Sequence, residues 1–223
     1  DSFTQLILTM KQEILLIDAP AGVLEVDAIW QSGERQTKDG LAILCHPNPV
    51  QGGTMNNKVV STMYRFCRDG GMDVLRFNFR GVGRSTGQTG TGDGELEDAL
   101  TVLRYALKHT KARKLWLGGF SFGGYTATRL ASLMTDNEEF FDVNLHNLAL
   151  IAPSVMRVGM ASLRWQADHT FMIYGDQDEL VSPEHLAQFA EEREIPTTVL
   201  STGHFFHGKL VELGQSLQKH TKI

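Results

Sequence analysis

The segment Gly119–Gly123 reads Gly-Phe-Ser-Phe-Gly, the Gly-x-Ser-x-Gly spacing at which a serine can act as a nucleophile. In such a nucleophile elbow the serine occupies a sharp turn from a strand into a helix, and the flanking glycines leave room for that turn. The free N–H groups at the helix start favour negative charge beside the hydroxyl. An apolar run precedes the motif and small residues follow it, so the sequence predicts Ser121 as a nucleophile rather than an incidental turn serine.

A histidine downstream is expected to serve as the base, because a serine hydroxyl is a weak nucleophile until its proton is removed. The chain order for this turn is serine, acid, histidine. His204 follows an expected strand and the turn 201–203, so a loop at a strand end would present it. His207 is the alternative and is less favoured, because it is expected to begin the last helix. The remaining downstream histidines are expected before strands, inside a helix or in the tail: His146, His169, His185 and His220.

The acid is expected after the preceding strand, where residues 175–179 read Gly-Asp-Gln-Asp-Glu. Asp178 is favoured because it lies further out, in the turn before the next helix. Asp176 is expected to form the turn by bonding its own backbone, and Glu179 is expected to be solvated. The carboxylate would fix the tautomer of the imidazole and stabilise its protonated form. The sequence thus predicts Asp178 as the acid.

Two convergent N–H groups are needed to form an oxyanion hole, and the backbone of Phe122, directly after the serine, would supply one. The second should come from the loop after the run 41–45, which reads His-Pro-Asn-Pro. Because proline has no N–H, Asn48 is the expected donor there. His46 is expected to hold this loop in place rather than to take part in catalysis.

The elements that must position these residues alternate along the chain. Two extended runs, 13–18 and 22–30, flank turn residues and predict an antiparallel hairpin. Apolar runs then alternate with helical spacing, which predicts a doubly wound, mostly parallel eight-stranded sheet in one α/β domain over 1–223. The further strands are expected at 41–45, 72–79, 114–118, 147–152, 170–174 and 197–200, and the helices at 57–68, 93–108, 121–134, from Pro183, and 206–219. Ligand sites in such sheets lie beyond the carboxyl ends of the strands, where the candidate residues fall.

The composition excludes several function classes. A net charge of −5 argues against a nucleic-acid surface, and no run approaches the roughly 18 apolar residues of a membrane span. Cys45 and Cys67 are too few for a disulfide framework, so buried free thiols and a cytoplasmic location are expected. No His/Cys/carboxylate cluster has zinc spacing, and the segment 81–83 does not fit a dinucleotide fingerprint. We therefore expect no metal and no cofactor.

Taken together, five segments resemble the α/β-hydrolase superfamily, and more narrowly its small lidless branch related to dienelactone hydrolase. They are 46–55, 76–85, 118–123, 175–178 and 203–208, and the resemblance covers nearly the whole chain. It implies Asp178 as the acid, His204 as the base, and a second strand antiparallel to the rest. Dienelactone hydrolase has a cysteine at the elbow, whereas Ser121 here favours ordinary ester hydrolysis.

The expected activity is hydrolysis of small or short-chain carboxylic esters through an acyl-enzyme. Only 153–169 separate two expected strands, which is too short for a cap domain and favours small acyl groups. Thioester, amide or peptide hydrolysis on the same triad stays open, as does a non-catalytic scaffold that acts as a binding protein. The expected partner is a small-molecule ester, and neither a nucleic acid nor a membrane is expected as a partner. The sequence is compatible with a monomer or a homodimer.

Overall fold

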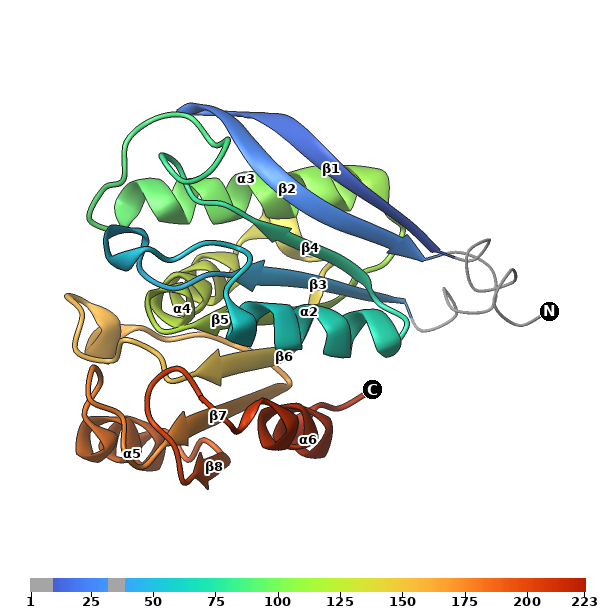
Figure 1. Cartoon of the computed structure of the whole chain (residues 1–223). Coiled ribbons are helices and arrows are strands. Elements are labelled where there is room, and N and C mark those ends of the chain that lie inside the picture. Colours follow the sequence, from blue (N-terminus) through green and yellow to red (C-terminus); the bar gives the residue numbers. More distant parts are fainter. Residues whose placement is uncertain (1–9, 32–38) are drawn as a thin grey trace.

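The computed structural model describes residues 10–31 and 39–223, and one eight-stranded sheet runs through them in the order β1-β2-β4-β3-β5-β6-β7-β8 (Figure 1). The strands are β1 (Met10–Ala19), β2 (Gly22–Gln31), β3 (Gly40–Cys45), β4 (Asp73–Phe77), β5 (Lys114–Phe120), β6 (Asn144–Ile151), β7 (His169–Gly175) and β8 (Thr197–Leu200). The helices are α2 (Lys58–Asp69), α3 (Asp93–His109), α4 (Phe122–Met134), α5 (Pro183–Glu192) and α6 (Leu210–His220), with short 3-10 turns η2 (Pro49–Gln51), η3 (Glu138–Phe140) and η4 (Met160–Ser162).

The sheet is antiparallel only at its N-terminal strands. β1 and β2 form a hairpin in which Ala19 pairs with Gly22, and β2 runs antiparallel to β4. All later pairs are parallel, so β3, β4, β6 and β7 point to the same edge in Figure 1, while β2 points the other way. This arrangement confirms the predicted mostly parallel sheet with antiparallel N-terminal strands.

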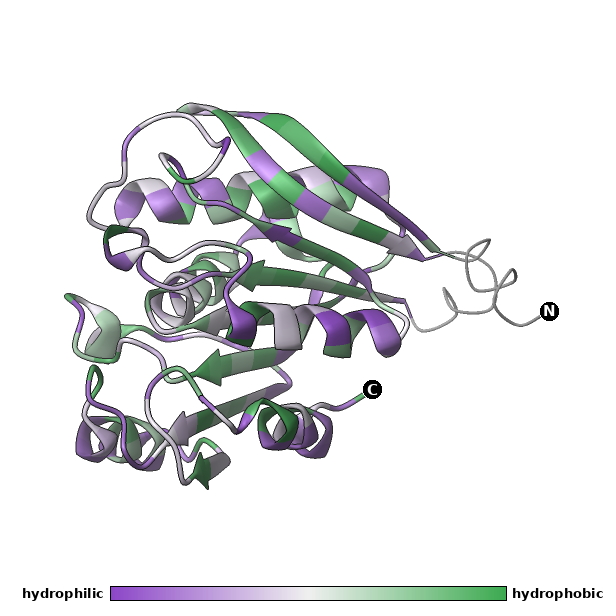
Figure 2. Ribbon diagram, viewed as in Figure 1, coloured by the Kyte–Doolittle hydropathy of each residue, from purple (hydrophilic) through white to green (hydrophobic). Residues whose placement is uncertain are grey.

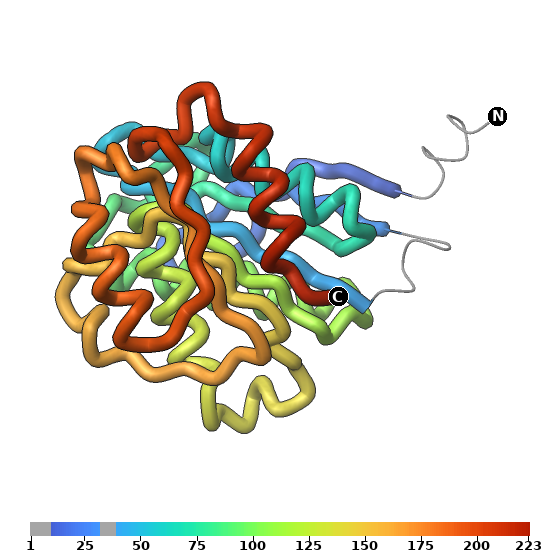
Figure 3. Tube along the Cα trace, turned by 90° about the horizontal axis from the view of Figure 1, so that it is seen from below, coloured from blue at the N-terminus to red at the C-terminus, as the bar shows by residue number. Residues whose placement is uncertain are grey.

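Helices cover both faces of the sheet, and the core lies between the layers. α3 packs beside α4 on one face. α2 packs beside α6 on the other face, and Figure 3 shows this second pair. All six residues of β3 are buried and apolar or glycine, as expected for a strand covered on both faces. Figure 2 shows the same apolar character along the central strands, with hydrophilic residues concentrated on the outer sides of the helices. Cys45 and Cys67 are buried free thiols in this core.

The last helix differs from the prediction. α6 begins at Leu210 and not at Phe206, because Phe206 (φ 57°) and Gly208 (φ 74°) adopt left-handed backbone conformations that interrupt a helix. The expectation that His207 starts this helix is therefore wrong: it is an exposed residue of the loop before α6. β6 begins at Asn144, so His146 lies inside that strand and not before it.

The carboxyl edge of the sheet carries no helical cap within residues 39–223. Between β6 and β7 the chain forms loops and only the short turn η4. This agrees with the lidless architecture expected from the short 153–169 connection. None of the helices in the described ranges has the length and apolar character needed to cross a bilayer.

Candidate active site

Ser121 stands in a strained turn between β5 and α4. Its backbone has φ 57° and ψ −116°, and a non-glycine residue in such a region costs about 1–3 kcal/mol. Two of its backbone hydrogen bonds join it to β6 and the loop beyond: its N–H donates to the Ile151 carbonyl (2.9 Å), and its carbonyl accepts from the Ser154 N–H (3.0 Å). The neighbouring strand β6 therefore supports the conformation that turns the Ser121 side chain out of the strand.

The glycines of the elbow are required by close packing. A Cβ on Gly119 would collide with the Gly123 carbonyl, and a Cβ on Gly123 would collide with the Cys45 carbonyl at the end of β3. The absence of both side chains lets strand β5, helix α4 and the loop after β3 approach one another. These two glycines thus explain why the turn with Ser121 and the loop with Asn48 can lie next to each other.

Three predicted residues are brought together at this edge: Ser121, His204 and Asp178. The His204 Nε2 lies 3.0 Å from the Ser121 Oγ, and its Nδ1 lies 2.6 Å from the Asp178 Oδ2. His204 is 2% exposed, Asp178 6% and Ser121 8%. With its proton on Nδ1, the imidazole donates to the carboxylate and accepts from the hydroxyl. The arrangement has the connectivity of a nucleophile, a base and an orienting acid.

Asp178 also binds backbone N–H groups that follow it, the kind of contact that was expected of Asp176. The Asp178 Oδ1 accepts from the N–H groups of Leu180 (2.9 Å) and Val181 (2.8 Å), so one oxygen holds the loop while the other faces His204. Asp176 lies in the turn directly after β7, as expected, but its exposed side chain makes no hydrogen bond with any described residue, so the predicted bond to its own backbone is not formed. Glu179 is exposed, as expected, although its carboxylate accepts weakly from the His204 N–H (3.4 Å).

Aromatic rings fix the His204 imidazole from two sides. The Phe120 ring lies 4.9 Å from it and tilted by 30°, and the Phe205 ring meets it edge-on at 5.0 Å. These contacts, with the carboxylate behind Nδ1, restrict rotation of the imidazole. His207 lies on the other side of Phe205, with ring centroids 6.1 Å apart. The structure therefore brings His204, and not His207, to the serine.

The two expected oxyanion donors lie on neighbouring segments. Phe122 is the first residue of α4, and its N–H is among the free donors of the helix start. Asn48 follows β3, and its side chain caps η2 by accepting from the Val50 N–H (3.0 Å). Neither the Phe122 N–H nor the Asn48 N–H has an acceptor among residues 10–31 and 39–223. Both donors remain predictions for the oxyanion hole.

His46 is buried, and its side chain links the loop after β3 to the segment after β4. Its Nδ1 lies 2.7 Å from the Pro47 carbonyl, and its Nε2 accepts from the Phe79 N–H at 3.0 Å. Burial lowers the pKa of His46 to about 4, so the imidazole is neutral at physiological pH. This geometry agrees with the expected structural role of holding the loop after β3.

Ser154 is a neighbour of the nucleophile that sequence reasoning missed. Its Oγ lies 3.5 Å from the Ser121 Oγ, and the residue is half-buried. No local motif marks it, since its position depends on the pairing of β6 beside β5. The only signal available in the sequence is that it follows the end of an apolar strand.

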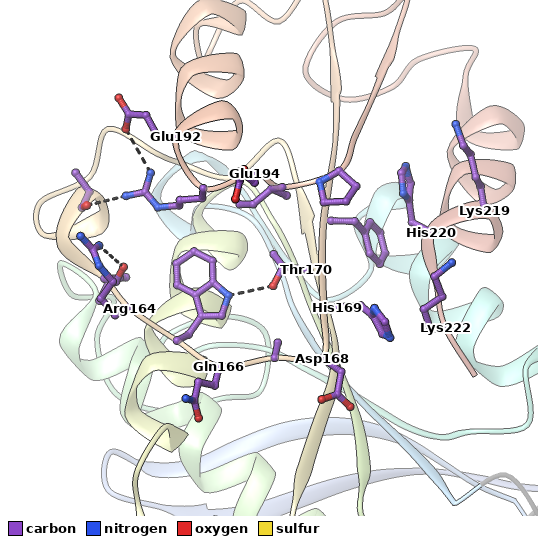
Figure 4. A pocket seen from close by; sticks show the side chains of 18 residues that line it. Arg164, Gln166, Asp168, His169, Thr170, Glu192, Glu194, Lys219, His220 and Lys222 are labelled. Carbon is purple, nitrogen blue, oxygen red and sulfur yellow. Dashed lines mark hydrogen bonds and ion pairs between the residues drawn. The ribbon is translucent and has the colours of Figure 1, made fainter.

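A large cavity lies elsewhere, at the amino edge of β7 and β8. Its volume is about 1010 Å³, and residues before β7, after α5 and at the end of α6 line it (Figure 4). Trp165 is one of its lining residues, and its indole N–H donates to the Thr170 hydroxyl (3.0 Å). None of the predicted site residues lines this cavity, so its size does not identify the reaction centre. In the described ranges no group of three or more His, Cys, Asp or Glu is placed to hold a metal.

Comparisons with known proteins agree with this geometry. A family model described as the alpha/beta hydrolase fold matches residues 50–156. An alpha-beta serine hydrolase homologue from Coxiella burnetii is 38% identical, with 94% of this chain and 97% of that chain covered and a TM-score of 0.82. The chain belongs to the α/β-hydrolase family. XC6422 from Xanthomonas campestris, described as an α/β serine hydrolase without lid, is 34% identical over 94% of this hydrolase and 93% of that chain, with a TM-score of 0.82.

A curated relative has no assigned activity. The uncharacterized protein RP471 from Rickettsia prowazekii is 30% identical over 192 residues, which cover 81% of this hydrolase and 77% of that protein. The similarity to XC6422 and the short β6–β7 connection place this α/β-hydrolase in the lidless serine hydrolase branch.

Proposed function

We propose that this α/β-hydrolase cleaves small or short-chain carboxylic esters, with Ser121 as the nucleophile. The observation that supports the proposal is a pair of linked side-chain contacts. The Asp178 Oδ2 lies 2.6 Å from the His204 Nδ1, and the His204 Nε2 lies 3.0 Å from the Ser121 Oγ. In these contacts the base touches the hydroxyl it would deprotonate, and the acid touches the base, as nucleophilic catalysis requires.

In the first half of the reaction, the Ser121 Oγ forms a bond to the ester carbonyl carbon while its proton passes to the His204 Nε2. The negative charge moves to the carbonyl oxygen, where the N–H groups of Phe122 and Asn48 would stabilise it. The C–O bond to the alcohol then breaks, and His204 returns the proton to the leaving oxygen. The product at this stage is an acyl group on Ser121.

In the second half, water replaces the alcohol. His204 removes a proton from the water as its oxygen bonds to the acyl carbon, and the Ser121 Oγ leaves with that proton. Asp178 stays ionised and stabilises the imidazolium formed in each half. The uncapped carboxyl edge favours a small acyl group, because no further segment within 39–223 encloses a long chain there.

The experiment combines a covalent label with substrate profiling. The parent, Ser121→Ala and Ser154→Ala are treated with a fluorophosphonate probe and assayed on p-nitrophenyl esters from acetyl to decanoyl. Ser154→Ala is a matched control, because it removes a hydroxyl 3.5 Å from the Ser121 Oγ while leaving the nucleophile in place. Circular dichroism verifies that each variant is folded.

We expect the parent and Ser154→Ala to be labelled and to hydrolyse short esters best, and Ser121→Ala to do neither. One hydroxyl at a strand end contributes little packing, so the Ser121→Ala fold should be intact. Labelling without ester turnover would keep the nucleophile but replace ester chemistry with thioester or amide hydrolysis. Ester turnover by Ser121→Ala equal to that of the parent would refute the assignment.

A further inference from the structure

Arg157 places a positive charge beside the start of α4. It lies in the loop after β6, three residues beyond Ser154, and its guanidinium carbon is 4.6 Å from the Phe122 ring centroid and 5.9 Å from that of Tyr125. Phe122 directly follows Ser121, and Tyr125 is on the next turn of the same helix face. The guanidinium therefore covers the first turn of the helix that presents the nucleophile.

The loop around Arg157 is held in this position. The Tyr125 hydroxyl donates to the Val158 carbonyl (2.8 Å), and the Arg157 N–H donates to the Ser154 carbonyl (3.2 Å). Met156 and Val158, on either side, are 69% and 92% exposed, whereas Arg157 is partly buried. The apolar neighbours thus face solvent, while the charged side chain packs onto the rings at the start of α4.

Arg157 also differs from the other arginines that pack on aromatic rings. Arg76, Arg129 and Arg193 each have a carboxylate oxygen within reach, at 2.9 Å, 2.8 Å and 3.6 Å. Among the described residues, Arg157 has no carboxylate within 4.0 Å, and its guanidinium makes no hydrogen bond. Because a ring occupies only the face of a guanidinium, the N–H donors in its plane stay available.

We propose that Arg157 recognises an anionic group of the substrate, a carboxylate or a phosphate, and makes anionic esters the preferred substrates. The inference rests on the proposed function, because it assigns the specificity of the same site. A guanidinium pairs with either group through two parallel N–H···O bonds, and partial burial strengthens such a pair. The Phe122 ring against the guanidinium belongs to the residue directly after Ser121, so the positive charge is held at the start of α4.

Pairs of esters that differ in charge but not in shape provide the test. 4-Nitrophenyl hemisuccinate is compared with 4-nitrophenyl 4-methylpentanoate for the acyl side, and 4-acetoxybenzoate with 4-isopropylphenyl acetate for the alcohol side. 4-Acetoxyphenyl phosphate is added to distinguish phosphate from carboxylate recognition. The quantity measured is the ratio of kcat/KM for the anionic ester to that for its neutral counterpart.

The variants are Arg157→Met, Arg157→Lys and the control Arg164→Met. Arg164 lies in the same β6–β7 connection but lines the cavity at the amino edge (Figure 4). We expect Arg157→Met to lower the ratio by about tenfold or more, as loss of a charge-assisted pair implies. Arg157→Lys should keep part of the preference, and Arg164→Met all of it. A ratio equal in the parent and Arg157→Met for every anionic ester would overturn the proposal.

A binding measurement separates this inference from the proposed reaction. In the Ser121→Ala background, which lacks the nucleophile, NMR titration compares N-phenylsuccinamate with its neutral analogue N-phenyl-4-methylpentanamide. Adding Arg157→Met should weaken binding of the anionic amide about tenfold and leave the neutral one within about twofold. If the parent hydrolyses no ester, the proposed function fails, and this titration alone decides Arg157. Equal binding of the anionic amide with and without Arg157 would then refute it.

Discussion

Two buried histidines at the same edge of the sheet have different surroundings, and the difference lies in single contacts. His46 accepts from the Phe79 backbone and faces the Pro47 carbonyl, so both ring nitrogens are engaged by the main chain. His204 faces the Asp178 carboxylate and the Ser121 hydroxyl instead. A neutral imidazole suits the first environment, whereas the second would stabilise the imidazolium that the proposed mechanism requires. The partner atoms, and not burial, therefore distinguish the two roles.

At this scale the proposed role of Asp178 as the acid can be tested directly. In Asp178→Asn the amide oxygen can still accept from the Leu180 and Val181 N–H groups, so the turn should survive. The amide nitrogen cannot accept the Nδ1 proton of His204, which favours the wrong tautomer and should lower kcat by about 10⁴-fold. Steady-state kinetics on a short ester measures the loss.

The matched control is Asp176→Asn, two residues away. The Asp176 side chain is exposed and makes no hydrogen bond within residues 39–223, so this variant should keep kcat within about twofold of the parent, as surface changes usually do. A large loss in Asp176→Asn with little change in Asp178→Asn would mean that the other aspartate is the acid.

At the scale of elements, the site depends on the close approach of three backbone segments: the end of β3, strand β5 and the start of α4. The start of α4 lies against the end of β3 with no side chain between them at Gly123, and α4 meets β5 in the same way at Gly119. Ser154, from the loop after β6, bonds the Ser121 carbonyl from the other side. The elbow is therefore fixed by its neighbouring strands as well as by its own turn.

A pair of glycine substitutions tests this packing. Glycine to alanine in a helix ordinarily stabilises by up to about 1 kcal/mol. Gly123→Ala should instead destabilise by about 1–3 kcal/mol, because its Cβ would meet the carbonyls of Cys45 and His46. Gly214→Ala in α6 should stabilise, since nothing lies within 4 Å of its Cβ. Urea denaturation gives both values, and equal shifts in the two variants would contradict the packing argument.

At the scale of the whole molecule, the sheet gathers residues that are far apart in the chain. Ser121 and His204 are 83 positions apart, and Asp178 and His204 are 26 apart. They follow β5, β7 and β8, whose parallel pairing brings their carboxyl ends to one edge. Any change that unfolds this edge should therefore remove the site together with the fold.

Stability against acid is a whole-molecule property that His46 should influence. Its pKa is lowered by burial from 6.5 to about 4, so between those values the unfolded chain binds a proton that the folded protein does not. The free energy of unfolding should therefore decrease as pH falls through this window, by at most about 3 kcal/mol from this residue. Urea denaturation at pH 7, 6, 5 and 4 measures the decrease.

The control for this dependence is His46→Gln, which retains an acceptor for the Phe79 N–H but does not titrate. We expect it to be less stable at pH 7 and to lose less stability between pH 6.5 and 4. Burial raises the pKa values of Asp73 and Asp98, so these carboxyls act in the opposite direction near the lower limit in both proteins. Identical pH dependence in the parent and His46→Gln would show that His46 does not contribute.

The sequence alone predicted the features that depend on local backbone and on periodicity. The elbow around Ser121 is encoded by the glycines beside it, and the strands by apolar runs that must be covered on both faces. The chain order of serine, acid and histidine restricted the site to two loops. The elbow and the strands could be predicted because each is set by residues that are neighbours in the chain.

Only the tertiary structure decided between close alternatives within those loops. His204 Nε2 lies 3.0 Å from the Ser121 Oγ, whereas His207 is exposed in the loop beyond the left-handed Phe206. Asp178 faces His204 with one oxygen and accepts backbone N–H groups with the other, whereas the exposed Asp176 side chain makes no hydrogen bond within residues 39–223. Ser154 and Arg157 have no motif at all. Their positions follow from the pairing of β6 with β5 and the fold of the loop beyond it, and such contacts between distant segments leave no local pattern in the sequence.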